Sequence, residues 1–202
     1  RENEFLAALF ADSEFDDVGF KQVGDSYLYL RGAWSVEALL SFPADVLIMD
    51  EYDRMDAAAV ELGRKRIRQS EIKREVCIST PTLPEIGIHA RYLVSDQRVW
   101  EVPCVGCEAW SELDYFRDVC ANGVHYDEWK DWNKEQVAVA DWSVTCPNCR
   151  AEIDRFGNGR WRALHPEIET LRGYQIPSLC FPAISLEELG ARAISKDPTV
   201  LP

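Results

Sequence analysis

The chain has 202 residues, of which 47% are hydrophobic and 11% aromatic, a composition typical of a folded globular protein and not of a disordered or collagen-like chain. With 22 Lys and Arg against 35 Asp and Glu, the formal net charge is −13, which disfavours a surface that coats nucleic acid everywhere but permits local contacts. The longest uncharged run, residues 173–186, contains two prolines and is too short for a membrane span. The chain begins without Met or a signal-peptide pattern, so we expect it to be cut from a longer one or processed.

The first half of the chain predicts a strand, a helix and a second strand in sequence. Residues 27–30 predict a strand, Ser35 can cap a short helix over 36–40, and the four apolar residues 46–49 predict a strand buried on both faces. Asp56 can cap a helix over about 57–69, and residues 75–79 predict the next strand. Because such crossovers are right-handed, we expect the strands at 46–49 and 75–79 to be parallel, with their carboxyl ends at one sheet edge.

Polar residues follow both of these strands. Asp50 and Glu51 come after the first, and Ser79 and Thr80 come after the second. An apolar strand that ends in Asp-Glu is typical of the Walker B motif of nucleoside triphosphatases, in which the Asp holds Mg²⁺ and the Glu orients and deprotonates the attacking water. The hydroxyls of Ser79 and Thr80 can then sense the γ-phosphate of ATP. The alternative is that the two acids only end a strand and solvate a loop. The sequence contains no G-x-x-x-x-G-K-[ST] phosphate loop, so we expect this chain alone not to hydrolyse ATP.

Four of the seven cysteines form two Cys-x-x-Cys pairs, whose members are Cys104, Cys107, Cys146 and Cys149. Two such pairs supply the four thiolates of a closed tetrahedral Zn²⁺ site, which is structural because no coordination position stays open. A rubredoxin-like iron site, two disulfides and a redox pair are the alternatives. The 38 residues between the pairs require an inserted hairpin or helix. Segment 104–149 has nine acidic and three basic residues, which favours a protein contact or a strut over a DNA-reading finger.

The remaining cysteines and charged residues predict no separate site. Cys120 and His125 are reserve ligands or ordinary residues, and Cys77 and Cys180 are expected to be buried thiols. Six basic residues on and after the predicted helix indicate a solvated face, with a DNA or nucleotide contact as the alternative: Arg64, Lys65, Arg66, Arg68, Lys73 and Arg74. Glu61 and Lys65 have the spacing of a helical ion pair. Six of the seven tryptophans lie between positions 100 and 161 and predict a core around the metal.

The end of the chain predicts an extended segment over 173–186 and a helix that Ser185 caps near Leu186. We expect three parts: residues 1–98 as the end of an ATPase core, 99–162 as a zinc-binding module, and 163–202 as an extended return segment with the start of a linker helix. The expected fold class is α/β, with a mostly parallel sheet and helices, plus an inserted Cys₄ zinc-ribbon-like module.

A set of motifs over roughly residues 26–190 resembles the large terminase subunit of tailed bacteriophages, in the lambda-like family. The matching residues are Y-L-R-G-A-W-S at 29–35, V-L-I-M-D-E-Y-D-R at 46–54, S-T-P at 79–81, Tyr92, V-P-C-V-G-C at 102–107, C-P-N-C at 146–149, G-R-W at 159–161 and G-Y-Q-I at 173–176. The resemblance implies part of a P-loop NTPase of the RecA-like type within a motor subunit that drives double-stranded DNA into a capsid. Asp50 and Glu51 are then the Walker B pair, and Ser79-Thr80-Pro81 is the motif that couples hydrolysis to movement.

The same resemblance implies the cofactors and partners. ATP and Mg²⁺ belong to the complete protein, whose phosphate loop is expected before residue 1 and whose nuclease is expected after residue 202. The expected partners are double-stranded DNA, the small terminase subunit, the portal protein and further copies of the subunit, in the host cytoplasm at the procapsid portal. A DEAD-like helicase fragment, which also carries Asp-Glu-x-Asp on a strand end, and a non-enzymatic zinc-ribbon adaptor are the alternative functions.

Overall fold

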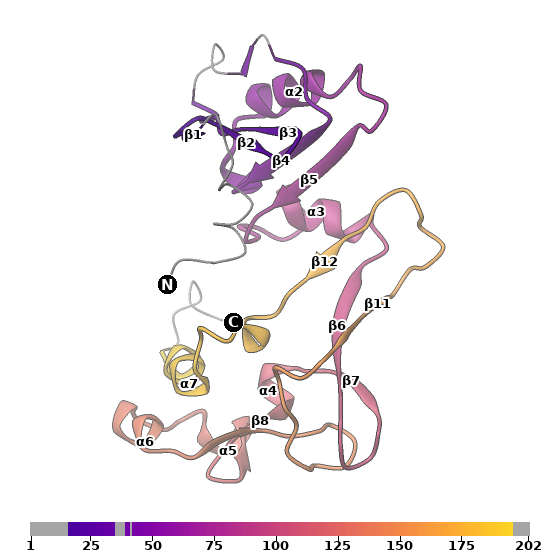
Figure 1. Ribbon diagram of the computed structural model, residues 1–202. Coiled ribbons are helices and arrows are strands. Elements are labelled where there is room, and N and C mark those ends of the chain that lie inside the picture. The colour runs from indigo at the N-terminus through magenta and orange to yellow at the C-terminus, as the bar shows by residue number, and fades with distance from the viewer. Residues whose placement is uncertain (1–15, 35–38, 41, 196–202) are drawn as a thin grey trace. The chain divides into compact units, whose positions relative to one another are not determined.

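The computed structural model describes residues 16–34, 39, 40 and 42–195, and the chain divides into two compact units, residues 1–89 (unit 1) and 90–202 (unit 2) (Figure 1). The predicted Ser35 cap and most of the predicted helix over 36–40 lie outside the described residues. No helix in the described part of the chain is long and apolar enough to cross a bilayer.

The described part of unit 1 begins with a small antiparallel sheet of β1 (Asp16–Asp17), β2 (Phe20–Val23) and β3 (Ser26–Tyr29). The turn between β2 and β3 contains Gly24 with a φ of 57°, a backbone region that glycine enters at little cost. Strand β3 corresponds to the strand predicted over 27–30.

The strand–helix–strand prediction corresponds to β4 (Val46–Asp50), α2 (Ala57–Arg66) and β5 (Arg74–Ile78). Strands β4 and β5 are parallel and in register from Val46 opposite Arg74 to Asp50 opposite Ile78. The carboxylate of Asp56 accepts a hydrogen bond from the N–H of Ala58 at 2.7 Å and so caps α2. Helix α2 ends three residues earlier than predicted, because residues 67–70 form a turn in which the N–H of Ser70 bonds to the carbonyl of Ile67.

Only one face of the β4–β5 pair is covered. Gly63 of α2 packs against the side chain of Leu47, and Met49 on the same face is buried. On the other face Val46, Ile48 and Ile78 are 43%, 58% and 52% exposed. The prediction that the strand at 46–49 is buried on both faces is therefore wrong for the described residues, because no second layer packs on that face within unit 1.

Unit 2 contains a four-stranded sheet around β6 (Arg98–Pro103). Strands β7 (Trp110–Glu112) and β11 (Arg160–Ala163) pair with β6 in the antiparallel direction, and β12 (Tyr174–Gln175) pairs with it in the parallel direction. Among the described strands, β4–β5 and β6–β12 are the parallel pairs, so the expected mostly parallel sheet is not what these residues form. In several of the remaining pairs the two strands are joined by a short connection, and strands joined in this way pair antiparallel.

The segment between the two Cys pairs folds into a small layered module. It contains the antiparallel strands β8 (Val119–Ala121), β9 (Val124–His125) and β10 (Trp142–Val144), with helices α4 (Tyr115–Asp118), α5 (Tyr126–Trp129) and α6 (Lys134–Ala138). Asn133 and Gln136 form a reciprocal capping box at the start of α6. Trp129 is fully buried and meets the rings of Tyr115, Tyr126 and Trp142 edge to face.

The return segment completes this core. After the 3₁₀ turn η3 (Ser178–Cys180), helix α7 (Leu186–Ile194) begins at Ser185, whose hydroxyl accepts a hydrogen bond from the N–H of Glu188 at 3.0 Å. Leu189 of α7 is fully buried, and Gly190 lies so close to Trp142 that a Cβ there would be 2.5 Å from the indole ring. The buried cluster of unit 2 thus joins residues from Val102 to Ala193, including Cys104, Cys146 and Trp129.

Candidate functional site

The first candidate site is the carboxyl edge of β4 and β5. Asp50 is the last residue of β4 and lies opposite Ile78, the last residue of β5, so Asp50, Glu51, Ser79 and Thr80 leave the sheet at one edge. The Asp50 carboxylate accepts a hydrogen bond from the N–H of Glu51 at 3.1 Å. The side chains of Asp50, Glu51 and Thr80 are exposed, so they are accessible to a ligand.

Glu51 has an unusual backbone. Its φ and ψ are 54° and 44°, the left-handed region that non-glycine residues seldom adopt, and it starts the 3₁₀ turn η2 (Tyr52–Arg54). The carbonyl of Glu51 accepts from the N–H of Arg54 at 2.8 Å, and its carboxylate lies 3.6 Å from the Arg54 guanidinium. Such a conformation costs free energy and persists only where neighbouring contacts hold it, which is common at functional sites.

Sequence reasoning did not assign a role to Asp53, which the structure places between the two strand ends. The Asp53 N–H donates to the hydroxyl of Ser79 at 3.1 Å. Its carboxylate accepts from the N–H and the hydroxyl of Thr82 at 3.0 and 3.1 Å and from the N–H of Ile88 at 2.6 Å. The hydroxyl of Ser79 therefore accepts a hydrogen bond from Asp53. The signal in the sequence is the second aspartate of Asp-Glu-x-Asp.

The second candidate site is the cluster of Cys104, Cys107, Cys146 and Cys149, whose sulfur atoms all lie within 4.8 Å of one another. In the described part of the chain, no other group of three or more His, Cys, Asp or Glu side chains can hold a metal ion in this way. Cys104 and Cys146 are buried, whereas Cys107 and Cys149 are exposed. The predicted spacing therefore brings all four cysteines together.

The two Cys pairs have the same backbone structure. In each, the N–H of the first Cys bonds to the carbonyl of the residue five positions later, Ala109 for Cys104 at 2.9 Å and Ala151 for Cys146 at 2.8 Å. The residue after the second Cys has a positive φ in both pairs, 59° and 63°. The N–H of the residue two positions after the first Cys lies 3.3 Å from its sulfur in one pair and 3.4 Å in the other. The shared pattern Cys-x-x-Cys-x-Ala marks this repeat in the sequence.

The geometry of the sulfurs fits a tetrahedral metal ion and excludes disulfides between them. Cys104 and Cys149 sulfurs are 3.6 Å apart, and those of Cys107 and Cys146 are 3.8 Å apart, far beyond the S–S bond of about 2.05 Å. Metal–sulfur bonds of about 2.3 Å in a tetrahedron place the sulfurs about 3.8 Å apart.

The surroundings of the cluster shift the pKa values of two of its thiols in opposite directions. Although burial opposes ionisation, the N–H groups of Cys149 and Asn148 lower the pKa of Cys146 to about 7. The N–H of Ala109 also favours a Cys107 thiolate, but the neighbouring cysteines, first among them Cys149, raise its pKa to about 12. Metal ions bind cysteine as the thiolate, so a cation at this cluster would bind as the thiols lose their protons, and the four sulfurs are placed to hold it.

Cys120 and His125 do not join this cluster. Cys120 is buried and lies 3.4 Å from Nδ1 of His125 and 3.7 Å from the hydroxyl of Thr145. Cys120 of β8 is buried and His125 of β9 is half-buried, so they are ordinary residues of the module, as one of the two interpretations of the sequence predicts.

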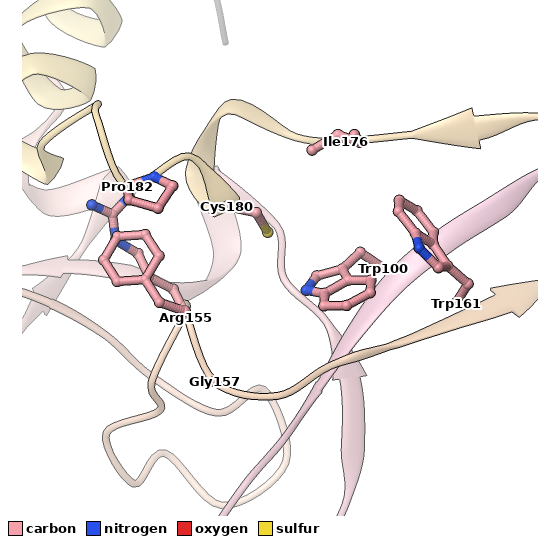
Figure 2. A pocket seen from close by; sticks show the side chains of 8 residues that line it. Trp100, Arg155, Gly157, Trp161, Ile176, Cys180 and Pro182 are labelled. Atoms are coloured by element: carbon pink, nitrogen blue, oxygen red, sulfur yellow. The ribbon is translucent and has the colours of Figure 1, made fainter. Parts of the chain in front are cut away.

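A pocket of about 340 Å³ in unit 2 carries no catalytic constellation (Figure 2). Trp100 and Trp161 meet edge to face on one side of it, and Arg155 and Cys180 lie on another. The guanidinium of Arg155 donates to the carbonyls of Leu179 and Ile184, both at 2.7 Å, so it holds the return segment in place. Burial raises the pKa of Cys180, which makes its thiol a poor nucleophile.

The basic cluster of α2 is partly internal. Arg64 binds the carboxylate of Glu75 on β5 through two nitrogens at 3.0 Å each, and it binds Glu61 at 2.7 Å. The hydrogen bonds with Glu75 and Glu61 raise the pKa of Arg64. Glu61 thus pairs with Arg64 and not with Lys65 as its spacing predicts, and Lys65 and Arg68 are exposed.

A match in the comparison with protein families covers most of the chain. The family described as phage terminase large subunit gpA, ATPase domain, matches residues 2–164. Neither the curated proteins nor the solved structures compared with the chain give a match. The matched range includes the β4–β5 edge and all four clustered cysteines. The chain therefore belongs to the family of ATPase domains of phage terminase large subunits of the gpA type.

Proposed function

We propose that this chain is part of a DNA-packaging motor subunit in which ATP hydrolysis drives double-stranded DNA into a capsid. The observation that supports the proposal most directly is the parallel β4–β5 pair, which brings Asp50, Glu51 and Ser79 to one sheet edge in a chain of the terminase ATPase family. Open α/β sheets bind their ligands at this edge.

The residues of the edge have separate roles in the proposed reaction. Asp50 would hold Mg²⁺ at the end of β4, and the ion would supply neutralisation of the charge on the phosphates there. Glu51 orients the attacking water and accepts its proton. Ser79 and Thr80 follow the neighbouring strand and link the state of the nucleotide to movement of the chain beyond them.

The exposed face of the β4–β5 pair favours the view that the pair belongs to a larger domain. Parallel sheets are normally covered on both faces, yet Val46, Ile48 and Ile78 are about half exposed in unit 1. We infer that further elements of a P-loop domain of the RecA-like type cover this face in the complete subunit. These elements also supply the phosphate loop that the 202 residues lack.

The Cys cluster has a structural role in this proposal. Zn²⁺ is the ion that we assign to it, because a Cys₄ set has no open position for chemistry and two of its sulfurs belong to the buried core of unit 2. The acidic module around it suits a protein partner of the motor, either the small terminase subunit or the portal protein, at the procapsid portal in the host cytoplasm. Several copies of the subunit form the motor.

The test is the ATPase activity of the complete subunit with Glu51→Gln, measured with and without double-stranded DNA. Loss of the proposed base is expected to lower kcat by about 10² or more while nucleotide binding is retained. Glu71→Gln is the matched control, since Glu71 is an exposed glutamate of unit 1 away from the sheet edge. A Glu51→Gln rate within a few fold of the wild-type rate contradicts the assignment.

A further inference from the structure

Asp53 joins three segments of unit 1 that are separate in the sequence. Its backbone N–H bonds to Ser79, directly after β5, and its carboxylate binds Thr82 and Ile88. Ile88 lies in the first turn of α3 (Gly87–Leu93). One residue next to the end of β4 therefore holds both the end of β5 and the start of the following helix.

The backbone around Asp53 is shaped to admit its carboxylate. Gly87 has a φ of 59°, and a Cβ at this position would lie 2.3 Å from the nearer carboxylate oxygen of Asp53. Such a contact is far below van der Waals distance, so position 87 requires glycine for both its conformation and its lack of a side chain. The approach of α3 to Asp53 thus depends on a residue 34 positions away in the sequence.

Both oxygens of the Asp53 carboxylate accept hydrogen bonds. One oxygen accepts from the N–H and hydroxyl of Thr82, and the other accepts from the N–H of Ile88. Burial alone raises the pKa of this carboxyl, but these hydrogen bonds outweigh it and hold the pKa below the ordinary value. An ionised carboxylate that accepts at both oxygens is a firm link, because no neutral side chain of the same size accepts at both ends.

Asp53 also belongs to the turn that follows Glu51. Asp53 is the middle residue of η2, and the carbonyl of Glu51 closes that turn through the N–H of Arg54. Glu51, with its left-handed backbone, is the residue immediately before η2, and such a conformation persists where neighbouring contacts hold it. The hydrogen bonds of Asp53 fasten η2 to Ser79 and Thr82, which follow β5, and to Ile88 of α3.

We propose that Asp53 is a positioning residue that orients Glu51 for attack on water and ties that orientation to the segment from Ser79 to the start of α3. This inference rests on the proposed role of Asp50 and Glu51. It adds that the two strand ends are joined mechanically: a shift of the segment after β5 acts on Glu51 through the Asp53 carboxylate, and a shift of Glu51 acts on α3 by the same route.

The experiment is steady-state ATPase kinetics of the complete subunit with Asp53→Asn. Asparagine keeps the shape of the side chain but accepts at only one end, so either Thr82 or Ile88 loses its partner. We expect kcat to fall about 10- to 100-fold, since misplacing a catalytic group by about 1 Å has an effect of this size. The KM for ATP is expected to stay within about threefold, because Asp53 does not contact the nucleotide in this proposal.

A double variant tests whether Asp53 acts through Glu51. In the Glu51→Gln background, Asp53→Asn is expected to lower kcat by no more than about twofold further, because the group that it positions is already lost. A residue that merely stabilises the fold would instead reduce the rate by the same factor in both backgrounds. If the double variant loses kcat by the product of the two single-variant factors, the inference is wrong.

Glycine variants provide a second route that leaves Asp53 unchanged. Gly87→Ala places a methyl group against the carboxylate and is expected to lower kcat as Asp53→Asn does. Gly24→Ala is the matched control, because Gly24 has a φ of 57° but a Cβ there would meet no atom within 4 Å. We expect Gly24→Ala to leave kcat unchanged. Equal effects of the two alanine variants contradict the inference.

The results also separate this inference from the function on which it rests. A Glu51→Gln variant with a wild-type rate refutes the Walker B assignment, and the inference falls with it. An inactive Glu51→Gln variant together with an Asp53→Asn variant that is folded and has the wild-type kcat refutes only the role of Asp53. Circular dichroism of each variant establishes that it is folded.

Discussion

Loss of the metal from the Cys cluster is expected to unfold unit 2 and to leave unit 1 folded. Cys104 and Cys146 are 1% and 0% exposed and belong to the same buried cluster as Trp129 and Leu189, so the metal and the core form one cooperative structure. Binding of a structural Zn²⁺ contributes about 10–16 kcal/mol of apparent folding free energy. A typical domain is stable by about 5–15 kcal/mol, so Cys146→Ser or a strong chelator removes about as much free energy as unit 2 has.

Tryptophan fluorescence is a direct assay for this unfolding. Six of the seven tryptophans lie in unit 2, and Trp34 is the one in the sequence of unit 1. Exposure of the fully buried Trp129 is expected to shift the emission to longer wavelength. Metal content, measured on the same sample, is expected to fall from one ion per chain to none, and an iron site would differ from a zinc site by its colour.

Cys180→Ser is the control for this substitution. Cys180 lies in unit 2 outside the metal cluster, so its replacement is expected to keep the metal and the buried tryptophans. If Cys146→Ser or chelation leaves the emission spectrum and the melting temperature unchanged, the four cysteines are not a structural metal site. Loss of the β4–β5 pair along with unit 2 would show instead that the two units fold together.

Two further predictions concern charged side chains. Although burial opposes ionisation, hydrogen bonds from two arginines of β11 hold the pKa of Glu101 below its ordinary value. The ionised Glu101 therefore stabilises the folded state fully at pH values above the ordinary carboxyl pKa, and this stabilisation is lost as the pH falls through the lowered pKa. The melting temperature measured as a function of pH tests this prediction. Glu101→Gln is expected to lower the free energy of unfolding by about 1–3 kcal/mol at neutral pH and to make the stability fall less on acidification. Arg64→Ala is expected to lower the free energy of unfolding of unit 1 by about 1–2 kcal/mol in urea unfolding. Lys65 is exposed, so Lys65→Ala is expected to change neither the stability nor the DNA-stimulated ATPase activity. A smaller stimulation of the ATPase by DNA in Lys65→Ala would establish a DNA contact.

Local patterns predict the elements that local physics determines. The apolar run before Asp50 predicts β4, Asp56 predicts the start of α2, and Ser185 predicts the start of α7. The spacing of the two Cys pairs predicts the sulfur cluster, because a two-residue gap turns both thiols toward one point. Each of these signals lies within a few residues of the element that it specifies.

The features that sequence reasoning missed depend on contacts between distant residues. Glu101 is buried only because β11 brings Arg160 and Arg162 to β6, about 60 positions later in the chain. Asp53 gains its role from donors 29 and 35 positions away and from the positive φ of Glu51. A periodicity within one strand or helix contains no information on such pairs.

A metal ion held by the two Cys pairs would also restrict the unfolded chain of the acidic module. They bring Cys104 and Cys149 to 3.6 Å, so an ion between them closes a loop of more than forty residues in the unfolded chain. For a covalent link, closing a loop of this length removes about 4 kcal/mol of chain entropy from the unfolded state. The ion therefore acts on the module's unfolded ensemble as well as on its folded core. A chain that has bound its metal has therefore already lost part of the conformational freedom that β8, β9, β10 and the three short helices must give up on folding.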